Sequence, residues 1–107
     1  MSSFDKREEG FEKKYALDEE QKFKAEARRN KLLGLWVAEK LGKAGDDASA
    51  YAREVVASDF EEAGDGDVVR KVLGDLTAKG VAITEPMLRI KMDELMAQAV
   101  VQVKAGT

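Results

Sequence analysis

The cationic side chains between residues 22 and 31 are the groups of this sequence best suited to bind an anion. Five cations lie within ten positions, namely Lys22, Lys24, Arg28, Arg29 and Lys31. Arginine and lysine bind phosphate and carboxylate groups through charge-assisted hydrogen bonds. The stretch therefore predicts a phosphate site with Arg28, Arg29 or Lys31 as its contacts. The alternative is an ordinary solvated helix face, on which Glu20 and Lys24 form an i, i+4 pair.

Duplex nucleic acid fits this charge pattern poorly. The net charge is −3, and a second stretch is as acidic as the first is basic, with Asp59, Glu61, Glu62, Asp65 and Asp67. A polyanion would meet one short basic segment and an opposing acidic one, so the chain as a whole is not attracted to it. We expect no nucleic-acid partner. A nucleotide-sensing or nucleic-acid-binding module that uses the basic stretch is nevertheless the alternative function.

Side chains that could perform catalysis are scarce. The sequence contains no histidine and no cysteine, which removes the commonest general base and the strongest side-chain nucleophile. None of the serines has a neighbour able to act as a base. The Asp65-Gly66-Asp67 run is similar to the start of a calcium loop, but Val69 stands where an oxygen ligand is needed. We predict a protein that is not an enzyme, has no metal site and requires no cofactor.

The first 17 residues differ in character from the rest. They carry acids and bases in balance, and they hold three of the chain's few aromatics: Phe4, Phe11 and Tyr15. The spacing i, i+7, i+11 places these rings on one helix face, which Glu8 interrupts. A helix this short is marginal in water. We therefore predict that residues 1–17 are a disordered arm that becomes helical in a partner's groove, rather than a frayed terminus without a role.

Residues 18–107 are predicted to form one all-α domain, a four-helix bundle. Alanine, lysine, glutamate and leucine dominate, and no stretch alternates with period two for long. Apolar stripes at helical spacing predict helices over residues 18–41, 46–63, 65–79 and 84–103, joined by short loops. The second half of the first helix is apolar nearly all round, so this helix should be the central one.

Several residues mark where these helices begin, end and cross. We expect acids at the helix starts to act as caps: Asp18 for the first helix, Asp46 or Asp47 for the second, and Asp65 to Asp67 for the third. Thr84 should cap the fourth helix, with Pro86 in its first turn. Gly42, Gly64 and Gly80 should end the first three helices. Gly34 and Gly74 lie inside helices and predict close helix crossings, and Trp36 is predicted to be a core residue.

The sequence also predicts where the protein resides. No apolar run approaches the roughly 20 residues of a membrane span, and the N-terminus lacks the apolar stretch of a secretory signal. The acids of the first segment argue against a mitochondrial transit peptide. We expect a cytoplasmic protein without direct membrane insertion, monomeric when free.

Several blocks of the sequence resemble one known family. The blocks are Phe4–Glu8, Phe11–Ala16, Phe23–Trp36, Tyr51–Val56 and Asp59–Gly64. Together they are similar to the zeta subunit, the small inhibitor of the F-type ATP synthase in alphaproteobacteria. The likeness covers essentially the whole chain, and the block around Arg28 to Trp36 is highly specific. Ser58, Gly66 and much of Val81–Thr107 depart from the pattern, and these departures concern helix packing and capping.

The resemblance implies a four-helix bundle whose arm blocks ATP hydrolysis by the catalytic head. The arm is expected to enter a catalytic interface between alpha and beta subunits and to reach toward the rotor, so that it blocks rotation in the hydrolytic direction. The inhibitory contacts are assigned to Phe4, Asp5, Arg7, Phe11, Lys14 and Tyr15. The protein would lie in the cytoplasm, peripheral to the inner membrane through the synthase. The resemblance also implies ADP or ATP as a regulatory ligand, without a motif that defines its site.

Overall fold

The computed structural model describes residues 16–59 and 65–106, and all the regular structure in these ranges is α-helical. The helices are α2 (Glu19–Lys40), α3 (Gly45–Ala57), α4 (Gly66–Lys79) and α5 (Glu85–Lys104). The predicted all-α fold and its four helices are confirmed. The predicted arm lies almost entirely outside the described residues. None of the described helices is both long enough and apolar enough to cross a membrane.

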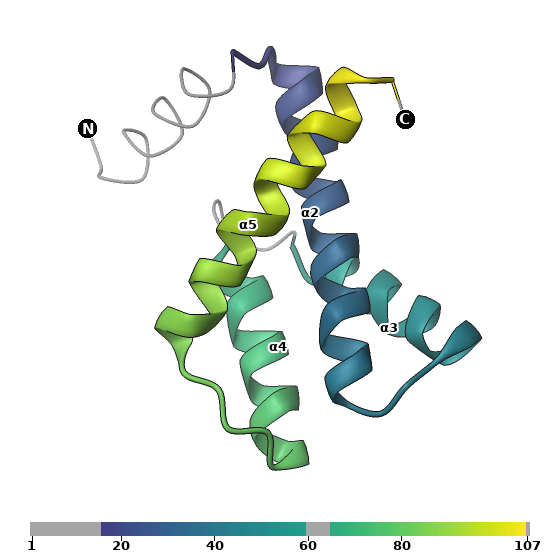
Figure 1. The fold of residues 1–107 in the computed structure, drawn as a ribbon, viewed down its shortest axis with the longest axis vertical. Helices are drawn as coiled ribbons and strands as arrows, with labels where there is room; N and C mark the ends of the chain where they lie inside the picture. The colour runs from purple at the N-terminus through teal and green to yellow at the C-terminus, as the bar shows by residue number, and fades with distance from the viewer. Residues whose placement is uncertain (1–15, 60–64, 107) are drawn as a thin grey trace.

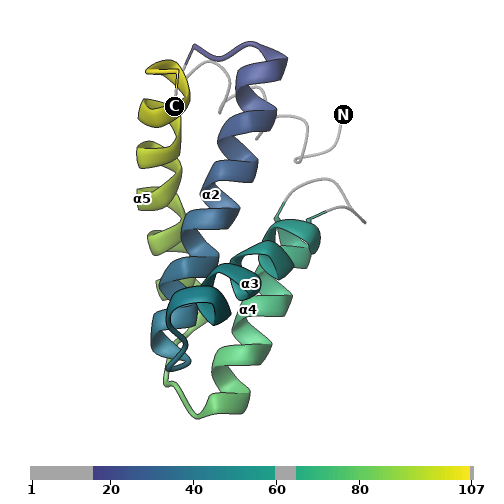
Figure 2. The ribbon, with the colours of Figure 1, turned by 90° about the vertical axis from the view of Figure 1, so that its right-hand side faces the viewer.

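Helix α2 is the central element, as the sequence predicts. It packs against α3 and α5 over long stretches and also touches α4 (Figures 1 and 2). Helix α5 runs beside α2 in the opposite direction, so that the start of α2 and the end of α5 lie at the same end of the molecule (Figure 1). Helix α3 crosses α2 obliquely, and α4 lies near the other end (Figure 2).

Helix α2 begins and ends where its sequence predicts. The Asp18 carboxylate accepts a hydrogen bond from the Gln21 amide at 2.7 Å, and the Gln21 side chain accepts one in return from the Asp18 amide at 3.3 Å. This reciprocal cap satisfies two backbone donors at the helix start. At the other end Gly42 has a φ of +79°. The Gly42 and Lys43 amides bond back to Glu39 and Ala38, which closes the helix.

The ends of α3 differ from the prediction. The N-cap residue is Ala44, not Asp46 or Asp47, and these two acids lie in the first turn, where the helix dipole still favours them. The helix ends at Ala57 instead of at Gly64. The Ser58 hydroxyl donates to the Val55 carbonyl at 2.7 Å, so the last turn closes on itself. Phe60 and Ala63, which fall within the range of 46–63 predicted for this helix, lie outside the described residues.

Helices α4 and α5 follow the prediction more closely. Asp65 is the N-cap residue of α4, but its side chain makes no cap hydrogen bond because arginines engage its carboxylate instead. Gly80, with a φ of +83°, ends α4 as predicted. The Thr84 hydroxyl accepts from the Met87 amide at 3.3 Å, which confirms the predicted cap of α5, and Pro86 lies in the first turn.

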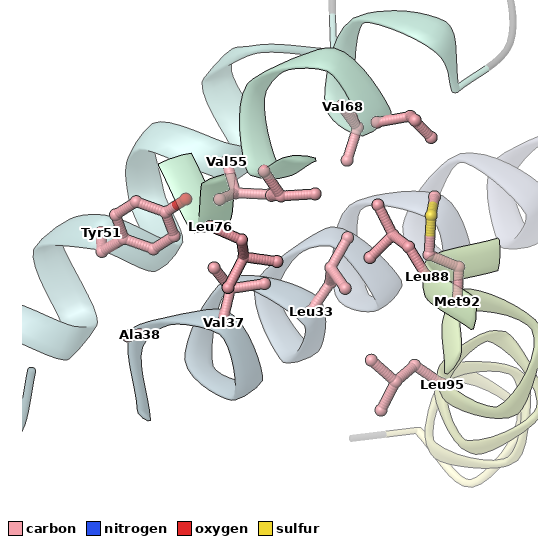
Figure 3. Packing of buried hydrophobic residues seen from close by; sticks show 12 residues of the cluster. Leu33, Val37, Ala38, Tyr51, Val55, Val68, Leu76, Leu88, Met92 and Leu95 are labelled. Carbon is pink, nitrogen blue, oxygen red and sulfur yellow. The ribbon is translucent and has the colours of Figure 1, made fainter. Parts of the chain in front are cut away.

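The main core lies where α2 meets the other three helices. Its largest fully buried side chains are Leu33, Val37, Val55, Val68, Val72, Leu76, Leu88 and Met92 (Figure 3). Gly34 permits the close crossing of α2 and α3, since a Cβ there would lie 2.5 Å from the Ala52 Cα atom. The matching prediction for Gly74 is wrong, because a Cβ at that exposed position would meet nothing within 4 Å. Trp36 packs at the edge of the core and is only partly buried.

A smaller apolar cluster lies at the end of the molecule from which the arm leaves. It joins the start of α2 to the end of α5 through Leu17, Ala25, Met96 and Val100, with Val103 packed against it. Leu17 is only 8% exposed, so its side chain belongs to the bundle. The sequence-based division between residues 17 and 18 leaves Leu17 in the arm, and that division stays a prediction.

Candidate functional site

The six residues predicted to carry the inhibitory contacts lie outside the described part of the chain. They are Phe4, Asp5, Arg7, Phe11, Lys14 and Tyr15. The structure does describe the point at which this segment joins the bundle. Ala16 has a φ of +54°, so the backbone turns there, and the next residue, Leu17, is packed against α5. The first 15 residues are thus attached to the bundle beside the N-terminal half of α2.

The exposed face of α2 next to this junction combines cations with apolar side chains. A surface hollow of about 510 Å³ is lined by Phe23, Lys24, Ala27, Arg28, Lys31, Val56, Val103 and Gly106. Phe23 is 73% exposed although it is a large aromatic. A second hollow of about 660 Å³ shares Lys31 and Val56 with the first and continues between α2 and α3 to Leu35 and Arg53. We call the two together the basic groove.

The cations of the basic groove differ in how firmly they are held. The Arg28 guanidinium donates to the Gln102 side chain of α5 at 2.9 Å, so it is anchored across two helices. Lys24 pairs with Glu20 at 3.0 Å, which confirms the predicted i, i+4 pair. Both members of that pair are largely exposed, and such pairs contribute little to stability. Lys24 is therefore available for a partner at small cost, and Lys31 is exposed on the same face.

Arg29 lies on the other side of α2, away from the basic groove. Only 7% of it is exposed, its Nε donates to the Asn30 side chain at 2.8 Å, and its guanidinium lies 3.9 Å from the Asp65 carboxylate. Burial lowers the pKa of Arg29, and the nearby carboxylates of Asp65 and Asp59 oppose that shift. The guanidinium is already engaged, so of the three predicted phosphate contacts only Arg28 and Lys31 share a surface. The nucleotide site stays a prediction.

Arg29 belongs to a polar cluster, buried at two of its five members, that the spacing of residues in the sequence does not reveal. The cluster consists of Arg29, Asn30, Asp59, Asp65 and Arg89. Asn30, 1% exposed, donates to Asp59 at 2.9 Å, and Arg89 pairs with Asp65 at 3.2 Å. Arg89 also donates to Glu85, and that hydrogen bond raises the pKa of Arg89. The two residues that flank positions 60–64 are thus both tied to α2.

The signal for this cluster was present in the sequence. Arg29 occupies the i+4 position between Ala25 and Leu33 on the stripe of α2 that continues to Val37, and all three of those side chains are fully buried. A charge on a buried stripe requires a partner. The partners lie 30 and 36 positions further along the chain, so spacing alone could not name them.

No group of three or more potential metal ligands occurs among residues 16–59 and 65–106. The basic groove presents exposed lysines, an arginine bonded to α5 and an exposed aromatic ring. Such a surface fits an acidic protein surface or a phosphorylated ligand.

Comparisons with known proteins agree on one family. The family model described as ATPase inhibitor subunit zeta matches residues 1–102. A protein whose structure was determined in solution by NMR is 61% identical to this chain, with a TM-score of 0.70, and the match covers 79% of this chain and 96% of that one. No curated protein matches. The chain therefore belongs to the ATPase inhibitor subunit zeta family.

Proposed function

We propose that this chain blocks ATP hydrolysis by the F-type ATP synthase by inserting residues 1–15 between a catalytic alpha and beta subunit. The inserted segment reaches toward the rotor and opposes rotation in the hydrolytic direction. The observation that carries this proposal is the extent of the family match, which begins at residue 1 and so includes the aromatic-rich segment. The protein acts as a non-catalytic regulator in the cytoplasm, held at the inner membrane by the synthase, and it is monomeric when free.

The energetics of insertion require the bundle as well as the arm. Burying each of Phe4, Phe11 and Tyr15 contributes about 1.5–3 kcal/mol. Ordering the backbone costs about 1–2 kcal/mol per residue, which consumes much of that gain over 15 residues. The bundle must supply further affinity outside the catalytic interface. The basic groove lies beside the point where the arm leaves, so it is the surface we assign to this second contact with the head.

ADP or ATP is the ligand we propose for the same groove. The supporting observation is the hollow of about 510 Å³ lined by Lys24, Arg28 and Lys31, where side-chain cations converge next to the exposed ring of Phe23. Cations can hold the phosphates, and the ring can stack on the base. Arg29, the third predicted contact, would have to leave the polar cluster to join them. A nucleotide bound there would compete with docking on the head.

The test uses the full chain with Phe4, Phe11 and Tyr15 replaced by alanine. The variant should inhibit ATP hydrolysis by isolated ATPase heads at least tenfold more weakly than the unchanged chain, because the buried apolar area is gone. Val101→Ala is the matched control, since Val101 is an apolar side chain of the bundle that is 68% exposed and should not matter. Undiminished inhibition by the triple variant would reject the arm as the inhibitory element.

A further inference from the structure

Another surface hollow lies near the C-terminal end of α2. It has a volume of about 270 Å³ and opens between the C-terminal half of α2, the segment before α5, and the first turns of α5. The side chains that characterise it are Trp36, Ile83, Met87, Ile90, Lys40 and Lys91. We call it the Trp36 hollow.

The floor of the Trp36 hollow is apolar and unusually exposed. Met87 is 54% exposed and Ile90 is 62% exposed, although both are large apolar residues. They belong to the face of α5 opposite the one that enters the core through Leu88 and Met92. Single exposed apolar side chains are ordinary, but a contiguous group beside a tryptophan is typical of a protein-binding surface.

The rim of the hollow carries two lysines, Lys40 and Lys91, and one carboxylate, Glu94, so its net charge is positive. The Lys40 ammonium lies 4.7 Å from the centre of the Trp36 ring, and that of Lys91 lies 5.5 Å from it. Lys91 also pairs with Glu94 at 3.4 Å. No described carboxylate forms an ion pair with Lys40, whose ammonium lies over the Trp36 ring. An apolar floor with a cationic rim is complementary to an apolar side chain flanked by carboxylates.

We infer that the Trp36 hollow binds an acidic amphipathic helix of the ATPase head, with one large apolar side chain on Ile90 and Met87 and carboxylates facing Lys40 and Lys91. The inference rests on the proposed function and adds a second docking site to it. A groove between two helices is the common seat for such a helix. The bundle would then contact the head at both ends of α2.

Two other occupants fit the hollow less well. A second copy of this chain, related by a two-fold axis, would bring the same cationic rims face to face, which costs energy. Residues 1–15 of the chain itself carry four acidic and four basic side chains. Such a balanced segment is less complementary to a cationic rim than an acidic helix is.

Methionine methyl signals measure occupancy of the hollow in the full chain. Met87 lies in the hollow, while Met92 and Met96, on the same helix, are 2% and 7% exposed and serve as internal controls. Adding unlabelled ATPase heads to methyl-labelled chain should shift or broaden the Met87 signal more than those of Met92 and Met96. An unchanged Met87 signal with inhibition intact would overturn the inference and leave the proposed function standing. Absence of both binding and inhibition would overturn both.

A pair of matched variants measures the energetic weight of the hollow. The chain has no cysteine, so a fluorophore on Thr77→Cys, on the exposed side of α4, reports binding to the head by anisotropy. Met87→Ser with Ile90→Ser should weaken binding at least tenfold. Val101→Ser, which removes an equally exposed apolar side chain of α5 outside the hollow, should change binding less than twofold. Equal affinities for the two variants would overturn the inference.

Charge and self-association complete the test. Lys40→Glu should weaken binding at least fivefold at low salt, and the loss should shrink as salt is raised. A Met87 shift that appears on concentrating the free chain without heads would assign the hollow to a second copy and overturn the inference. If the Met87 signal of the free chain moves when Phe4 and Phe11 are replaced by alanine, the hollow binds the arm. That result would also overturn the inference.

Discussion

The N-terminal half of helix α2 combines directional polar bonds with a small apolar cluster, whereas the C-terminal half packs into the main core. In the N-terminal half three consecutive residues reach three different neighbours: Arg28 bonds to Gln102 of α5, Arg29 approaches Asp65, and Asn30 donates to Asp59. In the C-terminal half Leu33 and Val37 pack without polar partners into the main core. Directional bonds specify orientation, whereas apolar packing supplies most of the stability.

This division matches the proposed roles of the two halves. The half that carries Phe23, Lys24 and Arg28 of the basic groove, and beside which the arm leaves, is oriented by bonds of defined geometry. The other half anchors the bundle and carries the Trp36 hollow at its surface. Substitutions in the C-terminal half should therefore lower the free energy of unfolding most. Substitutions in the N-terminal half should lower it less and should mainly change how α2 is oriented against its neighbours. Four comparisons of variants, in order of decreasing expected effect, test which contacts stabilise the bundle.

Leu33→Ala should have the largest effect on stability. Leu33 is fully buried at the centre of the core, and its truncation should lower the free energy of unfolding by about 2–5 kcal/mol, because transfer and cavity terms add. Leu35→Ala on the exposed side of the same helix should cost less than about 1 kcal/mol. Denaturant unfolding followed by far-UV circular dichroism measures both. Equal costs would contradict the placement of the core.

Gly34→Ala and Gly74→Ala should change stability in opposite directions. A Cβ at Gly34 would lie 2.5 Å from the Ala52 Cα atom, so α2 and α3 must separate, at about 1–3 kcal/mol. Gly74 has open space around it, so alanine there should stabilise α4 by about 0.5–1 kcal/mol. Thermal unfolding of the two variants gives the signs. A stabilising Gly34→Ala would mean that the crossing is looser than described.

Asn30→Ala tests the polar cluster. The substitution leaves Asp59 and the Arg29 Nε without the bonds that Asn30 provides, and should cost about 1–3 kcal/mol. The control is Gln102→Ala, which removes a single hydrogen bond that is only partly buried. It should lower the free energy of unfolding by about 0.5–1.5 kcal/mol. Urea unfolding compares the two. If Asn30→Ala costs no more than the control, the cluster contributes no specific constraint.

Tyr51→Phe should have the smallest effect. The Tyr51 hydroxyl donates to Asp75 at 2.7 Å, and Asp75 keeps Lys71 at 3.1 Å when the hydroxyl is removed, so the cost should be about 0.5–1.5 kcal/mol. Burial, and then the bond to Asp75, raise the pKa of Tyr51 in the folded state. A raised folded-state pKa means that this contribution is present below the unfolded-state pKa of about 10 and is lost as pH rises above it. The free energy of unfolding, measured from pH 8 to 11, should therefore fall less steeply with pH in Tyr51→Phe than in the unchanged chain.

The sequence predicted the helices better than the contacts between them. Periodicity and capping residues located α2, α4 and α5 closely, because Asp18, Gly80 and Thr84 act within one turn of the backbone. The predicted end of α3 was wrong because the apolar stripe continued past Ser58. In the structure the helix ends there, where the Ser58 hydroxyl bonds to the Val55 carbonyl and Asn30 bonds to Asp59. The second of these depends on a residue 29 positions away, which no local pattern contains.

The candidate sites were likewise predicted only in part. The cationic face of α2 was visible as a run of lysines and arginines, and Arg28 and Lys31 do share a surface. Arg29 faces inward because helical rotation separates it from Arg28 by about 100°. The Trp36 hollow was not foreseen, since Trp36 was assigned to the core and Met87 and Ile90 were not part of any predicted stripe. Its existence depends on α5 lying beside α2, a relation that the order of the helices does not determine.

The measurement that tests the central claim most directly is inhibition of ATP hydrolysis by a chain that begins at Ala16. All the buried apolar residues of the described core lie at Leu17 or beyond, so this chain should keep the fold, which the melting temperature and the emission of its single tryptophan, Trp36, can verify. The account predicts that the folded, shortened chain loses most of its inhibition of isolated ATPase heads. A shortened chain that inhibits at full strength would show that the bundle itself is the inhibitor and would contradict the account.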